Sequence, residues 1–312
     1  MRPLKMKSVP NVTGKQPALD LQDGMTLAQA ARNTTQALQA AGIDGASRDA
    51  RALVAAASRR PALDLIAYPD ADLNDAAAVR LEAMVQRRMR CEPVSRIIGE
   101  REFYGRTFQV NRATLDPRPD TETLVDAALE ISAQEGFRDQ PIRILDIGTG
   151  SGCVIVTLLA EFPSASGVAT DISPAALAIA AVNADRLGVA DRLELRQADA
   201  LEGIDDRYSL IVCNPPYIPS ADIASLARDV RDYDPVSALD GGSDGMQIFQ
   251  RIAPRLQSVI GSGETPGWAI LEVGAYQASS VAAILAANGL PVCRTWKDLG
   301  GHTRCVAVRS LG

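Results

Sequence analysis

From Pro141 to the C-terminus, short apolar segments alternate with longer segments of helical character, and this alternation constrains the fold more than any other feature of the sequence. The expected strands are 142–147, 167–171, 193–197, 208–213, 268–273 and 303–308, and the first two precede expected helices at 153–160 and 174–187. Such alternation predicts an α/β protein with a doubly wound, parallel sheet. Sheets of this kind bind ligands in the loops that follow the carboxyl ends of their strands.

The N-terminal third of the chain lacks this alternation and predicts a different organisation. Alanine-rich segments that begin at Thr26, Ser47 and Asn74 have helical periodicity, with Thr26 as an N-cap. Short alternations around Gly99 and Gly105 predict a β-hairpin. We therefore expect a disordered tail at 1–24, a small all-α domain at 25–92, a β-hairpin linker at 93–118 and the sheet domain at 119–312.

Composition excludes several classes of protein. The 38 acidic residues outnumber the 32 basic ones and give a net charge of −6, which argues against nucleic-acid binding through bulk neutralisation of phosphates. A single histidine, His302, and five cysteines without a CxxC pair argue against a metal site and indicate reduced thiols. No apolar stretch reaches the roughly 18 residues needed to span a bilayer, and none follows the basic N-terminus as in a secretory signal. We expect a cytoplasmic protein with no bound metal, no membrane segment and no stable nucleic-acid partner.

A glycine-rich loop follows the first expected strand. It reads Asp-Ile-Gly-Thr-Gly-Ser-Gly, with Gly148, Thr149, Gly150, Ser151 and Gly152 between the strand and a helix. Because glycine has no Cβ, the backbone can approach a ligand closely at the helix N-terminus. The spacing differs from that of the dinucleotide and nucleoside-triphosphate loops. With Asp171 at the end of the next strand, where an acid meets a ribose diol, the pattern favours a ribose-bearing cofactor without a pyrophosphate.

The fourth expected strand runs directly into Asn214, Pro215, Pro216 and Tyr217. The prolines stiffen the backbone and hold Asn214 in an extended conformation. The side-chain oxygen of Asn214 and the carbonyl oxygen of Pro215 can accept both hydrogens of a planar –NH2 group, beside the aromatic face of Tyr217. Such positioning promotes reaction of a poor nucleophile without a strong base. The pattern predicts Asn214 and Pro215 as catalytic residues, and all four residues as the substrate site.

Both loops resemble those of class I S-adenosylmethionine-dependent methyltransferases, which have a Rossmann-like sheet. By this resemblance S-adenosylmethionine is the methyl donor and is bound by the glycine loop and Asn214. Asp171 is implied to hold its ribose hydroxyls. Asp199 and Ala200, after the third strand, are implied to lie at its adenine, although Ala200 replaces an aromatic residue found in some members.

A run of further motifs is similar to the release factor glutamine methyltransferase family. These motifs are Glu-Pro-Val-Ser-Arg at 92–96, Pro-Arg-Pro-Asp-Thr-Glu at 117–122, Pro-Val-Ser-Ala-Leu-Asp-Gly-Gly-Ser-Asp-Gly at 235–245 and Leu-Glu-Val-Gly at 271–274. The resemblance covers most of the chain from about residue 26. It implies methylation at N5 of the glutamine in the Gly-Gly-Gln loop of bacterial class 1 peptide release factors, with the helical domain docking this partner. We expect the enzyme to be a monomer.

Three alternative functions remain. A glutamine methyltransferase of a large-subunit ribosomal protein would have a similar catalytic half. A DNA or RNA adenine amino-methyltransferase shares the Asn-Pro-Pro-Tyr tetrapeptide, but it needs a basic groove and stacking aromatics, which the net charge of −6 and 4% aromatic content disfavour. A catalytically silent cofactor-binding module is disfavoured because both loops are intact.

A basic cluster on the last helix of the helical domain has two interpretations. Arg87, Arg88 and Arg90 lie close together in the sequence. They form either a solvated helix face or a contact for an acidic surface of the partner, and the solvated face is the favoured interpretation.

Overall fold

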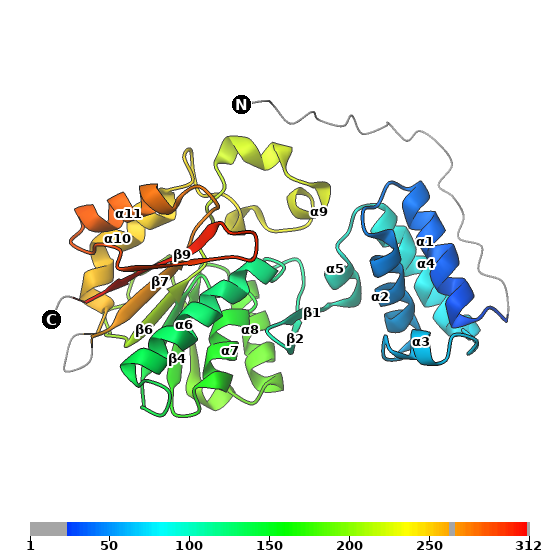
Figure 1. Ribbon diagram of the computed structural model, residues 1–312, viewed down its shortest axis with the longest axis horizontal. Helices are drawn as coiled ribbons and strands as arrows, with labels where there is room; N and C mark the ends of the chain where they lie inside the picture. Colours follow the sequence, from blue (N-terminus) through cyan, green and yellow to red (C-terminus); the bar gives the residue numbers. More distant parts are fainter. Residues whose placement is uncertain (1–23, 262–265, 311–312) are drawn as a thin grey trace. The chain divides into compact units, whose positions relative to one another are not determined.

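The computed structural model describes residues 24–261 and 266–310, which form two compact units divided between Ile98 and Gly99 (Figure 1). Residues 1–23 of the predicted tail lie outside the described residues. Within the described ranges, no helix is both long and apolar enough to cross a membrane.

The first unit is helical. It comprises α1 (Leu27–Ala40), α2 (Ala46–Ser58), α3 (Asp64–Ala67), α4 (Asp75–Met89) and α5 (Val94–Ile98). The predicted N-cap Thr26 is confirmed, because Thr26 Oγ1 accepts a hydrogen bond from the Gln29 N–H at 3.3 Å. Asn74 caps α4 in the same way, since its Oδ1 accepts a hydrogen bond from the Ala77 N–H at 2.9 Å. The apolar faces of these helices share one core, in which Leu53 is fully buried.

Two of the three clustered arginines stabilise this helical unit from within. The Arg87 guanidinium forms two hydrogen bonds with buried Glu92, at 2.6 and 2.8 Å. Arg88, whose side chain is 11% exposed, pairs with buried Asp49 on α2 at 2.8 Å. Arg88 is therefore not part of the solvated helix face that the sequence analysis favoured, whereas the Arg87 side chain is paired but remains 42% exposed.

The second unit contains a seven-stranded sheet with helices on both faces (Figure 1). Its order is β5-β4-β3-β6-β7-β9-β8, where the strands are β3 (Arg143–Ile147), β4 (Ser166–Asp171), β5 (Leu193–Gln197), β6 (Leu210–Cys213), β7 (Trp268–Glu272), β8 (Arg294–Lys297) and β9 (Thr303–Arg309). Helices α6 (Glu122–Glu135), α7 (Cys153–Glu161) and α8 (Pro174–Arg186) cover one face, and α10 (Gln247–Val259) and α11 (Ala278–Ala287) cover the other.

Burial on both faces explains why the central strands are apolar throughout. Ile144 of β3 packs in the core beneath α6 and α7, whereas its neighbour Leu145 packs in the core beneath α10 and α11. Strands β3 to β7 are parallel, as predicted. The chain leaves β3 toward β4 on one side and returns to β6 on the other, so the loops after β3 and β6 meet at a topological switch point.

The C-terminal part of the sheet departs from the prediction. Strand β9 is antiparallel to both β7 and β8, and β8, α10 and α11 were not predicted. Apolar periodicity indicates that a strand is buried but not which way it runs. The antiparallel direction places Cys305 opposite Glu272 and brings the β8–β9 turn, which contains His302, to the edge where the parallel strands end.

Several short elements connect the main strands and helices. The hairpin consists of β1 (Glu100–Phe103) and β2 (Arg106–Gln109), so it is shorter than the predicted 93–118, whose first residues form α5. The remaining short elements are η1 (Pro119–Thr121), η2 (Ala190–Arg192), η3 (Ser220–Ser225), α9 (Arg228–Arg231) and η4 (Val236–Ala238). The Asn183 side chain on α8 accepts from the Gln109 N–H at 2.7 Å and donates to its carbonyl at 3.0 Å, which fixes the hairpin to the sheet domain.

Candidate active site

The glycine loop between β3 and α7 leaves open space on its ligand side. Gly148 and Gly150 have φ values of +73° and +56°, and a Cβ added to either would meet no atom within 4 Å. The backbone N–H groups of Gly148 and Thr149 both donate to the Thr170 carbonyl on β4 at 2.9 Å, which holds the loop against the sheet. The bare backbone of the loop therefore faces a cavity.

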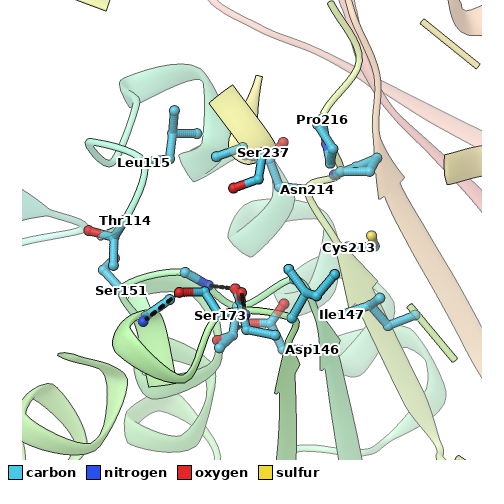
Figure 2. A pocket seen from close by; sticks show the side chains of 18 of the residues that line it. Thr114, Leu115, Asp146, Ile147, Ser151, Ser173, Cys213, Asn214, Pro216 and Ser237 are labelled. Atoms are coloured by element: carbon cyan, nitrogen blue, oxygen red, sulfur yellow. Dashed lines mark hydrogen bonds between the residues drawn. The ribbon is translucent and has the colours of Figure 1, made fainter. Parts of the chain in front are cut away.

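That cavity lies across the carboxyl ends of β3, β4, β5 and β6 and encloses about 1080 Å³, including solvent at its mouth (Figure 2). The predicted residues that line it are Gly148, Thr149, Gly150, Ser151, Asp171, Asp199, Ala200, Asn214, Pro215 and Pro216. Gly152 is not a lining residue. An added Cβ there would lie 3.1 Å from the Ala180 Cβ, so Gly152 permits close packing of α7 against α8.

Asp171 lies at the end of β4 and is already aligned by the backbone. Its Oδ2 accepts a hydrogen bond from the Gly150 N–H and its Oδ1 accepts one from the Ser173 N–H, both at 2.9 Å. Each carboxylate oxygen has a further lone pair. The side chain can therefore support the glycine loop and still accept two hydroxyl hydrogens from a ligand.

Strand β5, the third strand in the sequence of the sheet domain, leads to a partly apolar part of the cavity. Asp199 pairs with Arg251 of α10 at 2.8 Å, and Ala200 has a left-handed backbone with φ of +55°. Ile172 and Ile248, which the sequence analysis did not single out, contribute apolar surface here. The predicted contact of Asp199 and Ala200 with adenine remains a prediction, and it would have to coexist with the Asp199–Arg251 ion pair.

Asp146 is a buried acid at the base of the cavity that the sequence analysis did not assign to the site. It is 2% exposed, and its Oδ2 accepts a hydrogen bond from the Thr149 hydroxyl at 2.7 Å (Figure 2). Burial raises its pKa to about 7, and the nearby negative charge of Asp171 adds to this effect. The carboxyl group thus fixes the second residue of the glycine loop.

The raised pKa of Asp146 predicts a pH-dependent gain in stability for Asp146→Asn. The folded-state pKa lies above the unfolded value, so the stabilisation from this group is complete below about pH 4 and is lost as pH rises through about 7. Asparagine keeps an acceptor for Thr149 but never ionises. We expect the variant to exceed the wild type in unfolding free energy by on the order of 2 kcal/mol at pH 8 and by much less at pH 5.

Urea unfolding followed by circular dichroism at both pH values measures this difference, with substitution of the exposed Asp139 by asparagine as the control. A gain of equal size at pH 5 and pH 8 would show that ionisation of Asp146 is not its cause.

The Asn214 side chain is oriented by a hydrogen bond to Thr121, which also lines the cavity. Its side-chain Nδ2 donates to the Thr121 hydroxyl oxygen at 3.1 Å, which leaves its Oδ1 as an acceptor. Asn214, Pro215 and Pro216 line the cavity. Asn214 and Pro216 lie on the side away from Ser151 and Ser173 (Figure 2). The structure therefore brings the predicted acceptors and the glycine loop to one cavity.

Residues distant in the sequence hold the backbone of the Asn-Pro-Pro-Tyr tetrapeptide in place. Gln277 Nε2 donates to the Tyr217 carbonyl at 2.8 Å, and Gln277 Oε1 accepts from the Gly274 N–H at 3.0 Å. A Cβ on Gly241 would lie 2.9 Å from the Pro216 carbonyl oxygen, and one on Gly245 would collide with that of Tyr217. These glycines belong to motifs of the family resemblance, and their packing against the tetrapeptide gives those motifs a physical reason.

Tyr217 does not line the cavity in the described part of the chain. Its hydroxyl lies 3.5 Å from Oε1 of Glu272, and burial raises its pKa to about 12. The predicted packing of its ring on a substrate remains a prediction.

No metal site is found in the described ranges, where no three histidine, cysteine or acidic side chains are grouped to hold an ion. The five cysteines are free thiols, as predicted. His302 is exposed in the β8–β9 turn, away from the cavity lining.

The sheet topology and the site together define a class I S-adenosylmethionine-dependent methyltransferase. The cavity fits this cofactor, because the glycine backbone at Gly148 and Gly150 provides room for close approach and the two oxygens of Asp171 suit a ribose diol. The apolar surface near Ile172 and Ile248 suits a base.

Comparisons with known proteins agree with this class. Residues 29–99 match the PrmC N-terminal domain, and residues 124–228 match the methyltransferase small domain. The catalytic domain of hMettl16, solved in complex with a 3′UTR hairpin, superimposes with a TM-score of 0.53 at 17% identity over 75% of this chain and 81% of that one, which supports the fold alone.

Curated relatives extend the match to nearly the whole chain. The release factor glutamine methyltransferase of Cereibacter sphaeroides is 46% identical over 91% of this chain and 99% of its own. The protein of the same name from Bradyrhizobium diazoefficiens is 42% identical over 92% and 96% of the two chains. This chain belongs to the release factor glutamine methyltransferase family.

Proposed function

We propose that this enzyme methylates the side-chain amide nitrogen, N5, of the glutamine in the Gly-Gly-Gln loop of bacterial class 1 peptide release factors. The observation that carries the proposal is the orientation of Asn214, whose Nδ2 is engaged by Thr121 so that its Oδ1 is available as an acceptor beside the Pro215 carbonyl. The names of the relatives support this choice of substrate.

The proposed chemistry requires orientation more than proton abstraction. S-adenosylmethionine supplies a methyl group on a positively charged sulfur. Asn214 Oδ1 and the Pro215 carbonyl oxygen accept the two amide hydrogens, hold the nitrogen in place and oppose the positive charge that develops on it. The lining acids Asp146, Asp171 and Asp199 are each engaged in a hydrogen bond or ion pair. None of them is assigned as a base in this proposal, and the amide proton leaves to water after transfer.

The other parts of the proposal follow from the same enzyme class. The enzyme acts in the cytoplasm as a monomer, in translation termination. It forms no stable complex with nucleic acid, and the net charge of −6 supports this last point. The helical unit docks the release factor. Exposed apolar side chains support docking there, because Leu63, Ile66 and Tyr68 around α3 are each more than half exposed.

A methyl-transfer assay with labelled S-adenosylmethionine tests the proposal. Purified release factor, the same factor with its loop glutamine replaced by alanine, the ribosomal protein substrate and duplex DNA are offered separately. We expect label on the intact release factor alone, and much less on an isolated Gly-Gly-Gln peptide if the helical unit contributes to docking. Label on DNA or on the ribosomal protein, with none on the release factor, would reject the proposal.

A further inference from the structure

Two exposed apolar side chains lie on neighbouring loops at the sheet edge that carries the site. Leu299 is in the β8–β9 turn and is fully exposed, and Tyr276 is in the loop between β7 and α11 and is 87% exposed. The Tyr276 ring meets the His302 ring of the β8–β9 turn edge to face, with the ring centroids 5.7 Å apart. This contact joins the two loops into one surface, the rim patch, which consists of Tyr276, Leu299 and His302.

The β8–β9 turn presents Leu299 to solvent in a fixed conformation. The Asp298 N–H donates to the His302 carbonyl at 2.9 Å, and Asp298 Oδ1 accepts from the His302 N–H at 3.0 Å. Gly301 has a φ of +82°, a backbone conformation that favours glycine. Arg304 on β9 pairs with Asp298 at 2.7 Å. These interactions close the turn without the Leu299 side chain, so its exposure does not serve the fold.

A hydrogen bond and an ion pair connect the rim patch to the walls of the cavity. The residue after Tyr276 donates through its side-chain amide to the Tyr217 carbonyl at 2.8 Å. Arg304, which holds the β8–β9 turn, also pairs with Asp120 of η1 at 3.0 Å, and η1 contributes Thr121 to the cavity lining. The three patch residues do not line the cavity themselves. The patch therefore lies beside the cavity, on the surface next to the amide site.

A protein substrate must cover the surface around the cavity. When one side chain enters a cavity, the residues before and after it follow at Cα spacings of about 3.8 Å, so the adjoining chain lies over the rim. Exposed apolar and aromatic side chains at such a place are typical of a protein contact. The position of the rim patch thus favours the substrate protein as the molecule that covers it.

We propose that the rim patch binds the release factor beside its Gly-Gly-Gln loop, through apolar side chains of that protein. The inference rests on the proposed function, since it assigns a contact surface to the same substrate. It places a docking contact on the sheet domain itself, in addition to the helical unit. The patch residues do not touch the reacting atoms. They raise the affinity for the folded substrate and leave the chemical step to the residues that line the cavity.

Substitution of the two apolar residues tests this contact. In Leu299→Ser and in Tyr276→Ala we expect KM for the intact release factor to rise about tenfold, as for contacts that matter in an interface, with kcat within about twofold of the wild type. Leu299→Met and Tyr276→Phe keep the apolar surface and should keep KM within about threefold. Val182→Ser is the matched control, because Val182 is an exposed apolar residue on α8 that does not line the cavity.

Direct binding separates docking from an effect on the amide site. The release factor with its loop glutamine replaced by alanine cannot make the amide contact, but it keeps the surface that the patch would bind. Its Kd should rise about tenfold in Leu299→Ser and in Tyr276→Ala, and further in the double variant, while the Kd for S-adenosylmethionine stays within twofold. An unchanged Kd for this factor in the double variant, or a fall in kcat with KM unchanged, overturns the inference.

Sedimentation velocity at the assay concentration tests a second copy of this chain as the occupant. We expect the wild type and the double variant to sediment alike as monomers. A wild-type dimer that the double variant loses would assign the patch to self-association and overturn the inference. Absence of release factor methylation by the wild type would instead reject the proposed function, and the Kd for the alanine-substituted factor would still test the docking surface.

Discussion

Replacement of Asn214 by alanine is expected to lower kcat about 10²–10³-fold, the range found when one preorganised group at a developing charge is removed. The variant loses the side-chain acceptor for the substrate amide, and the Pro215 carbonyl alone cannot orient both hydrogens. Binding of S-adenosylmethionine should change only a few-fold, because the glycine loop and Asp171 remain intact. Single-turnover methyl transfer at saturating cofactor measures the first effect, and calorimetric titration measures the second.

Asn288→Ala is the matched control for this experiment. Asn288 follows α11, donates to the Ile284 carbonyl at 2.9 Å and does not line the cavity. Its replacement therefore shows how much kcat changes when an asparagine hydrogen bond is lost outside the site, in the same unit. We expect its kcat to remain within about twofold of the wild type. Full activity in Asn214→Ala would remove this residue from its assigned role and leave the backbone of Pro215 and Pro216 as the only acceptors.

The sequence predicted the parts of the site that depend on local chemistry. A glycine loop needs left-handed residues and an open face, and the structure has both at Gly148 and Gly150. A strand that runs into two prolines must present rigid carbonyl groups, and Pro215 and Pro216 line the cavity. These features can be read from a few consecutive residues because the backbone itself is restricted.

The residues that orient the site were missed because their partners are distant in sequence. Thr121 lies 93 residues before Asn214, and Gln277 lies 60 residues after Tyr217. Thr121 lies in the motif at 117–122, but nothing in that motif indicates that its partner is Asn214, and no local pattern distinguishes Gln277 from an ordinary polar residue. The same limitation applies to Arg88 in the helical unit. A run of arginines on a helix does not indicate whether a side chain is solvated or, as for Arg88, paired with a distant acid such as Asp49.

Strand direction was the main error in the fold, and it has a functional consequence. A parallel β9 would place its first residue at the opposite edge of the sheet. The antiparallel β9 instead brings Arg304 to the edge that carries the site, where it pairs with Asp120. The position of Thr121 thus depends on a topological feature that apolar periodicity does not encode.

Asp171→Ala is expected to raise the Kd for S-adenosylmethionine about 10²-fold, since hydrogen bonds to a charged group contribute about 1.5–3 kcal/mol each. The variant removes the acceptors for the ribose hydroxyls, and it also leaves the N–H groups of Gly150 and Ser173 without their carboxylate. At saturating cofactor the loss in kcat should be smaller, because Asn214 and its hydrogen bond to Thr121 are unaffected. Equilibrium dialysis with S-adenosylmethionine and S-adenosylhomocysteine measures the affinity.

The two roles of Asp171 can be separated by thermal unfolding. Loss of support for the glycine loop lowers the melting temperature of the protein without cofactor, whereas loss of the ribose contact lowers only the additional stabilisation that the cofactor provides. Asp185→Ala, at an exposed position on α8, controls for removal of an acidic side chain. If Asp171→Ala binds the cofactor within threefold of the wild type, the ribose contact is absent. If affinity falls while the cofactor-free melting temperature is unchanged, Asp171 acts on the ligand directly, and the glycine loop keeps its shape through its bonds to Thr170 and Asp146.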